Sequence, residues 1–499
     1  MKLDVEKTKK IIDGLINGIA NRAIYTKLVP RFLQLYLDAE VERGLDKVDT
    51  CATSQCLSVL AKAQYNDEDL ISEAVASVVR LRNQEGSWPS AITPEELADP
   101  NSRRPGDTAI GDNCFALTAL IDADFLDESF KYSKCLSEEY KKLSFRISYV
   151  LTAVDWLLKN KANDQIGWYY TDNVVAKSQS VTLTTLNVLQ IFSEIICCLE
   201  KCVDSTELST EQKDCCNIYI EKLKSELQTT TQQLNDVYEN IQNQWLAIGK
   251  HIGSHDPSII HTCKLLNLIL FNKRYNKIDL YDEAPIQDLI KFVVDNISSD
   301  EGLKKYAEPF YFESYELSKK SGLGLLARTI CVDHENFAEG IILFTAINIF
   351  TYWGNIDAKL ITNMANILTT QERMSLAKPY FFLCRSKREE KNNWNCPVYA
   401  SYEAYKALRN YMDNYDLIYS SSCSDTKSIE IVKKEDISDA IEKLEKAIHM
   451  NIHKNGFPSD VAHQYLKQLK TMQKSYKSIL KKDFYALLAE IKETTGVSF

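Results

Sequence analysis

The sequence of 499 residues is poor in the two residues that make tight turns, with 16 glycines and 11 prolines. Folds built from many strands and tight turns normally need more of both, so the low counts disfavour an all-β fold or a turn-rich α/β fold. Hydrophobic residues make up 45% of the chain, which is enough for a large core and excludes a wholly disordered protein. Composition therefore favours helices.

The sequence also lacks the marks of export, membrane insertion and nucleic-acid binding. Residues 1–7 have no apolar core of a secretory signal, and the best uncharged apolar stretch, 340–350, is too short to span a bilayer. A net charge of −10 argues against a protein that neutralises phosphates. Most of the 14 cysteines, such as Cys56 and Cys263, lie in apolar helical patterns, which predicts reduced, buried thiols and a cytoplasmic location.

One pattern recurs six times, at intervals of roughly 60 to 78 residues: a short helix rich in small and apolar residues. Its copies lie at residues 51–63, 111–121, 181–192, 258–270, 336–347 and 398–408. Between copies the spacing of apolar residues predicts amphipathic helices, most clearly at 71–81 and 149–158. A helix rich in small residues can be surrounded by neighbours, which suits an inner ring, and an amphipathic partner shields that ring from water.

Turns that contain glycine and tryptophan follow two of the amphipathic helices, at Gly86 with Trp88 and at Gly167 with Trp168. Glycine permits a sharp reversal of the chain, and the tryptophan is expected to wedge between successive repeats and fix their angle. We therefore predict an all-α fold, an α/α toroid of about six helix-pair repeats with an inserted helical hairpin and C-terminal helices.

The domain organisation follows from where the repeats stop. We expect N-terminal helices at 1–45, the toroid at 46–415 with the insertion at about 197–247, and a C-terminal helical hairpin at 430–499. Apolar residues at helical spacing predict the first helix of that hairpin: Ile437, Ile441, Leu444 and Ile448.

The segment 152–189 resembles one repeat of the prenyltransferase and squalene–hopene cyclase superfamily. It combines an apolar helix containing Trp156, a polar turn, the Gly167–Trp168 pair and a second apolar helix. The turn from Gln84 to Trp88 is similar to the glutamine–tryptophan element of that group. The resemblance covers about residues 45–415, is clearest in the second and third repeats, and implies a divergent member with an α/α toroid.

The resemblance also implies a zinc site. Protein prenyltransferases of this superfamily bind zinc through an aspartate and a cysteine two residues apart and a later histidine, and Asp112, Cys114 and His261 are similar to that set. Zinc would bind a carboxylate, a thiolate and an imidazole and leave one position for a substrate thiol. These residues fall on the second and fourth inner helices, whereas the family uses adjacent repeats. The alternative is that Asp112 caps its helix and Cys114 packs inside it.

A second metal hypothesis uses His251, His255 and His261. A glycine and a proline within this stretch predict a loop rather than one helix face. Solvated or helix-capping histidines are therefore the alternative. No other cofactor is expected.

Two acidic groups are further candidates. Asp122 and Asp124 resemble part of the acid motif of class II cyclases but lack its last aspartate, and aspartates at a helix end are usually solvated. Asp333, His334 and Glu335 form an acid/base candidate at the toroid mouth, with interaction with the helix dipole as the alternative.

The sequence contains no phosphate-binding glycine loop, nucleophile elbow, paired Cys-x-x-Cys elements or dinucleotide fingerprint. The first hypothesis is a binding or interaction protein, whose toroid cavity or mouth holds a ligand or a partner segment. A protein or an apolar small molecule is the expected partner, and an accessory role in a bacterial system is one setting for it. The alternative is a divergent isoprenoid-acting enzyme, similar to a zinc protein prenyltransferase or a terpene cyclase.

Overall fold

We describe the fold from a computed structural model of the chain. The described residues are 5–21, 23–25, 33–35, 48–89, 91–92, 110–169, 180–242, 252, 258–299, 338–354, 356–369, 397–422, 434–451, 459–474, 487–488, 491–492, 494–495 and 497. The chain divides into two compact units, Met1–Phe350 with Asn355–Tyr415, and Thr351–Gly354 with Asp416–Phe499.

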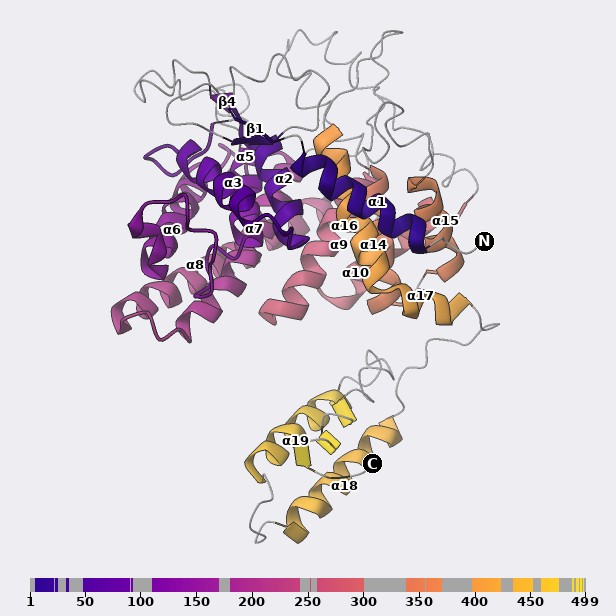
Figure 1. The fold of residues 1–499 in the computed structure, drawn as a ribbon. Coiled ribbons are helices and arrows are strands. Elements are labelled where there is room, and N and C mark those ends of the chain that lie inside the picture. The colour runs from indigo at the N-terminus through magenta and orange to yellow at the C-terminus, as the bar shows by residue number, and fades with distance from the viewer. Residues whose placement is uncertain are drawn as a thin grey trace. The chain divides into compact units, whose positions relative to one another are not determined.

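Almost all secondary structure in the described residues is helical, and this confirms the all-α prediction (Figure 1). The strands are pieces of two or three residues. β1 (Ala23–Tyr25) pairs antiparallel with β2 (Leu33–Leu35), and β3 (Val48–Asp49) pairs antiparallel with β4 (Ala91–Ile92).

The segments predicted as small-residue helices are all helical. They are α2 (Thr50–Lys62), α5 (Ile110–Asp122), α7 (Thr182–Val203), α9 (Ile259–Phe271), α14 (Ala338–Tyr352) and α16 (Pro397–Asp413). Small side chains fill enclosed positions in them, for example Ser54, Cys56 and Ser58 of α2. Such residues let neighbouring helices approach closely on several sides.

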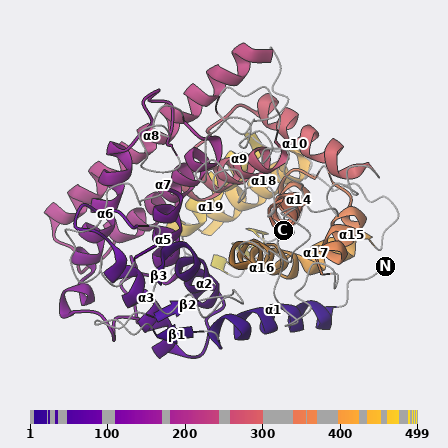
Figure 2. The same ribbon diagram turned by 90° about the horizontal axis from the view of Figure 1, so that it is seen from above.

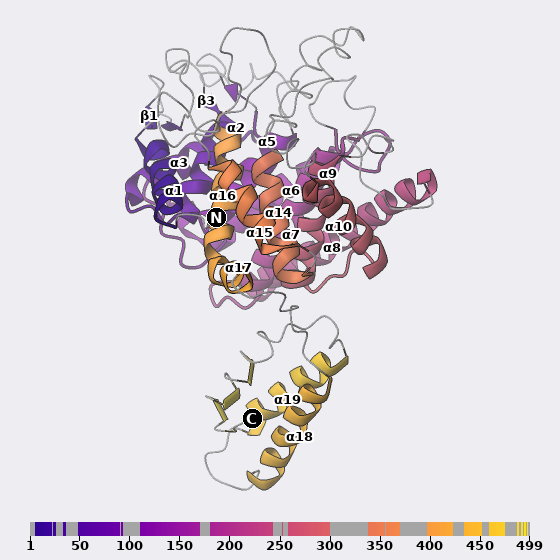
Figure 3. The same cartoon turned by 90° about the vertical axis from the view of Figure 1, so that its right-hand side faces the viewer.

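A second helix follows each small-residue helix. These helices are α3 (Glu68–Leu81), α6 (Leu143–Lys159), α8 (Thr210–Gln242), α10 (Glu283–Ser298), α15 (Ala358–Leu368) and α17 (Tyr415–Ser422). α3 packs on α2, α6 on α5, α8 on α7 and α10 on α9, while α15 packs on α16 (Figure 3). On α3 the predicted apolar positions, including Ile71, Val75 and Val78, are fully buried.

The small-residue helices are also one another's neighbours. α2 packs against α5, α5 against α7, α7 against α9, and α16 against α2 (Figure 2). Hydrogen bonds join the others: Asn267 of α9 donates to Thr345 of α14 (2.9 Å), and Asn410 of α16 donates to Asn348 of α14 (3.2 Å). The N-terminal helix α1 (Val5–Ala20) packs on both α16 and α2.

The first tryptophan turn joins α3 to α5. The indole Nε1 of Trp88 donates to the carbonyl oxygen of Val78 in the last turn of α3 (2.8 Å). The backbone N–H of Trp88 donates to the side-chain oxygen of Asn113, the fourth residue of α5 (2.8 Å). One residue therefore connects the amphipathic helix of one pair to the small-residue helix of the next.

The second tryptophan turn repeats this arrangement between α6 and α7. The indole of Trp168 donates to the carbonyl oxygen of Leu157 in α6 (2.7 Å), and its backbone N–H donates to the hydroxyl of Thr185 (3.0 Å). Thr185 is also the fourth residue of its helix. Both indole rings are fully buried, which confirms the predicted wedge between repeats.

The two glycines of these turns serve different purposes. Gly86 has a φ of +101°, a left-handed conformation that favours glycine, and supports the predicted sharp reversal. The same explanation is wrong for Gly167, which is not left-handed; Gln165, at φ +59°, takes that conformation instead. Gly167 is needed because a Cβ atom there would overlap the side chain of Thr185.

The segment 197–247, expected as an inserted hairpin, begins inside α7. The chain turns after Val203 and returns along α7 as α8, so α8 occupies the partner position for α7. Among the described helices, α7 is the one long and apolar enough to cross a bilayer, and 72% of its most apolar window is buried inside the protein.

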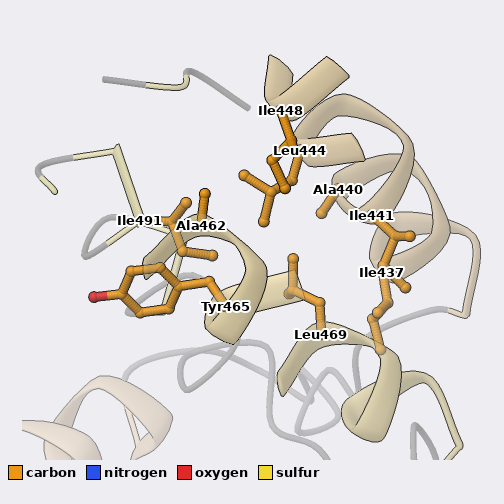
Figure 4. Packing of buried hydrophobic residues seen from close by; sticks show 9 residues of the cluster. All are labelled: Ile437, Ala440, Ile441, Leu444, Ile448, Ala462, Tyr465, Leu469 and Ile491. Atoms are coloured by element: carbon orange, nitrogen blue, oxygen red, sulfur yellow. The ribbon is translucent and has the colours of Figure 1, made fainter. Parts of the chain in front are cut away.

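In the second unit, α18 (Lys434–Asn451) and α19 (Ser459–Lys474) pack around an apolar core (Figure 4). The four predicted apolar positions of α18 are buried, which confirms that helix face. The core contains Ile437, Ala440, Ile441, Leu444, Ile448, Ala462, Tyr465, Leu469 and Ile491.

Replacing Trp168 by alanine is expected to lower the free energy of unfolding by ~3–5 kcal/mol, because a large buried ring and its hydrogen bond are lost. Urea denaturation measures this effect. Tyr275→Ala is the control, since that ring is 48% exposed. A loss of unfolding free energy for Trp168→Ala no larger than that of the control would contradict its role as a wedge.

Replacing Gly86 by alanine is expected to destabilise the protein by ~2–4 kcal/mol, because its φ is left-handed and the new Cβ would lie 2.5 Å from the carbonyl oxygen of Thr152. The matched control is Gly111→Ala, a helical position where no described atom lies within 4 Å of the new Cβ. That change is expected to stabilise the protein by ~0.5–1 kcal/mol. Equal changes in melting temperature for Gly86→Ala and Gly111→Ala would contradict this difference between the two glycines.

Candidate functional site

The small-residue helices are mostly buried, but some of them reach solvent along a narrow stripe. On α7 this stripe includes Asn187, Gln190 and Glu194, and on α9 it includes Lys264 and Asn267. Residues three, four or seven apart share one face of a helix. One polar face of an otherwise buried helix is therefore partly exposed.

Charged side chains from five of these helices come together at these stripes. We call them the six-charge cluster: Lys62 of α2, Asp122 of α5, Glu194 of α7, Lys264 of α9, and Glu403 and Lys406 of α16. The ammonium of Lys62 lies 3.1 Å from the carboxylate of Asp122. Glu403 pairs with both Lys264 and Lys406, each at 3.1 Å. Glu194 interacts electrostatically with Lys62, Asp122 and Lys406, which links the two groups.

Lys62 and Asp122 occupy equivalent positions at the C-terminal ends of neighbouring helices. Each is the last residue of its helix, and each helix is followed by a left-handed residue two positions on, Gln64 and Asp124. A carboxylate at a helix C-terminus is opposed by the helix dipole. Asp122 is compensated by the ammonium of Lys62 and by the hydroxyl of Ser58, which donates to it.

Glu403 is held in its ionised form. Burial alone would raise the pKa of this carboxyl, but the ammonium groups of Lys264 and Lys406 lower it to about 2. Burial lowers the pKa of Lys264, and Glu403 opposes that change. The three groups therefore depend on one another for their charges.

The ionised form of Glu194, in contrast, is disfavoured. Burial, reinforced by the carboxylate of Asp122, raises the pKa of Glu194, although Lys62 opposes this. Gln190 donates to one carboxyl oxygen (2.9 Å), while the other, Oε2, is buried without a hydrogen-bond partner among the described residues. A carboxyl whose charged form is disfavoured, on a face that solvent reaches, is typical of binding and proton-transfer sites.

Aromatic rings surround Lys406. Its ammonium lies 4.8 Å from the ring centre of Tyr402 and 5.7 Å from that of Phe344 on α14. The ring of Phe115 on α5 meets Tyr402 edge-on, with 6.5 Å between ring centres. These contacts restrict the position of Lys406 and add cation–π attraction.

The residues predicted as zinc ligands lie on two of the small-residue helices, α5 and α9. Asp112 lies in the first turn of α5, Cys114 is buried on the same helix, and His261 is buried on α9. Burial and then the charge of Asp112 raise the pKa of the Cys114 thiol, which disfavours the thiolate that zinc binds. α7 packs against both α5 and α9. Within the described part of the chain, no three His, Cys, Asp or Glu side chains are placed to hold a metal ion.

Five other candidates lie outside the described residues: His251, His255, Asp333, His334 and Glu335. Of the pair at the end of α5, Asp124 is exposed, as predicted. The solvated prediction is wrong for Asp122, whose side chain is only 9% exposed, because Lys62 and Ser58 enclose it.

Of the six residues of this cluster, only Asp122 is a candidate from the sequence. The available signal was a set of polar residues at helical spacing within otherwise apolar helices, such as Gln55, Ser58 and Lys62, or Gln190 and Glu194. Each set reads as an ordinary solvated stripe when its helix is considered alone. Only the packing of five helices shows that the stripes meet.

Comparison with models of known protein families and with characterised protein sequences finds no match. The geometry of the six-charge cluster is therefore the basis of the functional proposal.

The pKa of Glu403 is lowered and that of Glu194 is raised, so replacing each by glutamine is expected to change the stability in opposite directions. Glu403→Gln is expected to destabilise the protein by ~3 kcal/mol at neutral pH, because the pKa of this group falls from 4.5 to about 2 on folding. A lowered pKa stabilises the folded state above pH 4.5, and this contribution is lost as the pH falls from 4.5 to about 2. The effect of the substitution should vanish over that range.

Glu194→Gln is the matched variant and is expected to stabilise the protein at neutral pH, since the folded state disfavours the ionised carboxylate. This gain should also disappear in acid, where both the folded and the unfolded carboxyl are protonated. Urea unfolding of the three proteins between pH 2.5 and about pH 8 checks both signs. Destabilisation by both variants would contradict the charge states assigned here.

Proposed function

We propose that the chain is a binding module, an α/α toroid in which the six small-residue helices form the inner ring and the six-charge cluster holds a polar ligand or a partner segment. The observation that carries this proposal is the convergence of ionisable side chains from five helices, among which the three lysines are partly exposed. Groups of this kind that converge on one place are typical of ligand sites.

The order of helix contacts supports a closed ring. Successive small-residue helices are neighbours, and the last of them, α16, packs against the first, α2. In an open superhelix the terminal repeats contact only one neighbour each. α1 covers both α16 and α2, so an N-terminal helix supplies the partner where the ends of the ring meet.

The energetics of the cluster support a role beyond stability. Buried ion pairs contribute little net stability, because desolvation offsets their attraction. Glu194 even disfavours the folded state in its ionised form. Such groups are typical of positions that serve function at a cost in stability.

The isoprenoid-enzyme alternative receives less support. An isoprenoid chain needs a mainly apolar cavity, whereas six ionisable side chains meet where five of the small-residue helices come together. The same charges favour a polar ligand over the expected apolar one. A cytoplasmic location is retained in the proposal and is supported by the cysteines that the structure describes, all of which are free thiols.

Equilibrium dialysis of the purified chain tests the proposed function. The full chain is dialysed against a mixture of polar metabolites, short peptides and isoprenoid diphosphates, and retained compounds are identified by mass. We expect polar compounds to be retained unchanged, and to be lost when Lys62 is replaced by methionine. The control is Lys131→Met, which removes an exposed lysine that pairs with Glu68 on the outer helix α3.

Three results would overturn the proposal. Retention or conversion of an isoprenoid diphosphate would favour the enzyme. Stoichiometric zinc that is lost in Cys114→Ala would do the same. Equal retention by the wild type and Lys62→Met would remove the cluster from the binding surface.

A further inference from the structure

The cations and carboxylates of the six-charge cluster differ in exposure. The side chains of Lys62, Lys406 and Lys264 are 43%, 23% and 17% exposed. Those of Asp122 and Glu403 are only 9% and 3% exposed. The carboxylates therefore lie behind the ammonium groups, and a solute that reaches the cluster meets positive charge first.

At ion-pair distance, three ammonium groups share two carboxylates. Lys62 pairs with Asp122, whereas Lys264 and Lys406 share the single carboxylate of Glu403. Glu194 forms no ion pair with the described residues, so it is not one of these two carboxylates. A site with one more ammonium group than ion-paired carboxylates suits a single carboxylate better than a phosphate, which carries nearly two charges at neutral pH.

Gln55 provides a second, independent observation. It lies three residues before Ser58 and seven before Lys62, and so on the same face of α2. Its amide nitrogen and oxygen are both buried and have no hydrogen-bond partner among the described residues. A buried amide without partners costs free energy, so a ligand that pairs with it would gain affinity.

We infer that the six-charge cluster binds the carboxylate of a polar, amide-containing ligand, with Lys264 and Lys406 as the anchoring cations and Lys62 as a further donor. The amide of Gln55 pairs with a polar group farther along the ligand. Gln55 lies seven residues of helix, about 10 Å, before Lys62, and this sets how far the ligand extends from Lys62 to reach it. The inference rests on the proposed binding function and names the chemistry of the ligand.

Lysine acetylation read by mass spectrometry tests the inference. The probes are N-acetyl-diglycine, which has a carboxylate and amides, and N-acetyl-diglycinamide, which differs only in lacking the carboxylate. We expect the acid to slow acetylation of Lys62 and Lys406 and the amide to leave their rates unchanged. Lys131, 55% exposed on a separate ion pair, reports any general effect on the reagent.

Substitutions test the proposed contacts of Lys406 and Gln55 separately. Lys406→Met is expected to weaken protection of Lys62 by about tenfold, the equivalent of one charge-assisted hydrogen bond. Gln55→Leu is expected to weaken protection by N-acetyl-diglycine while leaving protection by acetate unchanged. Thermal melts establish that each variant is folded, and the comparison of acid with amide on the wild type needs no variant.

Inorganic phosphate, pyrophosphate and acetate complete the test at matched ionic strength. Acetate protection without N-acetyl-diglycine protection would leave a small organic acid as the source of the carboxylate, which supports the anion assignment and overturns the role of Gln55. Stronger protection by phosphate or pyrophosphate would overturn the charge argument. No protection by any anion beyond sodium chloride would overturn the inference, while polar compounds retained in dialysis would still support the proposed function.

Discussion

Close approach between helices rich in small residues is the constraint on which the first unit depends. At Gly340, near the start of α14, a Cβ atom would lie 2.7 Å from the carbonyl carbon of Glu403. The backbone of α14 therefore packs directly against the residue that pairs with two lysines. A bulkier side chain at this contact would move α16, and the charge cluster with it, so the packing of the helices and the geometry of the site cannot be separated.

The tryptophan turns extend this constraint from one helix pair to the next. Trp88 and Trp168 each connect the end of an amphipathic helix to the fourth residue of the following small-residue helix. Because this contact recurs at the same position in each helix, it fixes how far successive small-residue helices are shifted along their axes relative to one another. This axial shift determines which polar residues of neighbouring helices meet. Lys62 and Asp122, at equivalent helix ends, are one such pair.

The sequence predicts this fold well where the information is local. A recurring pattern of small residues predicts the small-residue helices, apolar spacing predicts the C-terminal helix face, and the glycine–tryptophan turns predict the wedges, because each depends on residues within a few turns. The reason for Gly167 could not be read in this way, since it depends on Thr185 across the turn. The charge cluster was missed for the same reason on a larger scale: its members are separated by up to hundreds of residues and meet only through packing.

The two buried carboxyls show what distinguishes this cluster from an ordinary ion-pair network. Glu403 has two ammonium partners and keeps its charge, whereas Glu194 has none at ion-pair distance among the described residues and resists ionisation. A network that served only to join helices would gain nothing from an under-compensated carboxyl beside exposed lysines. The asymmetry is consistent with a site that is completed by another molecule, because a ligand bearing both a carboxylate and hydrogen-bonding groups would supply the partners that this chain does not.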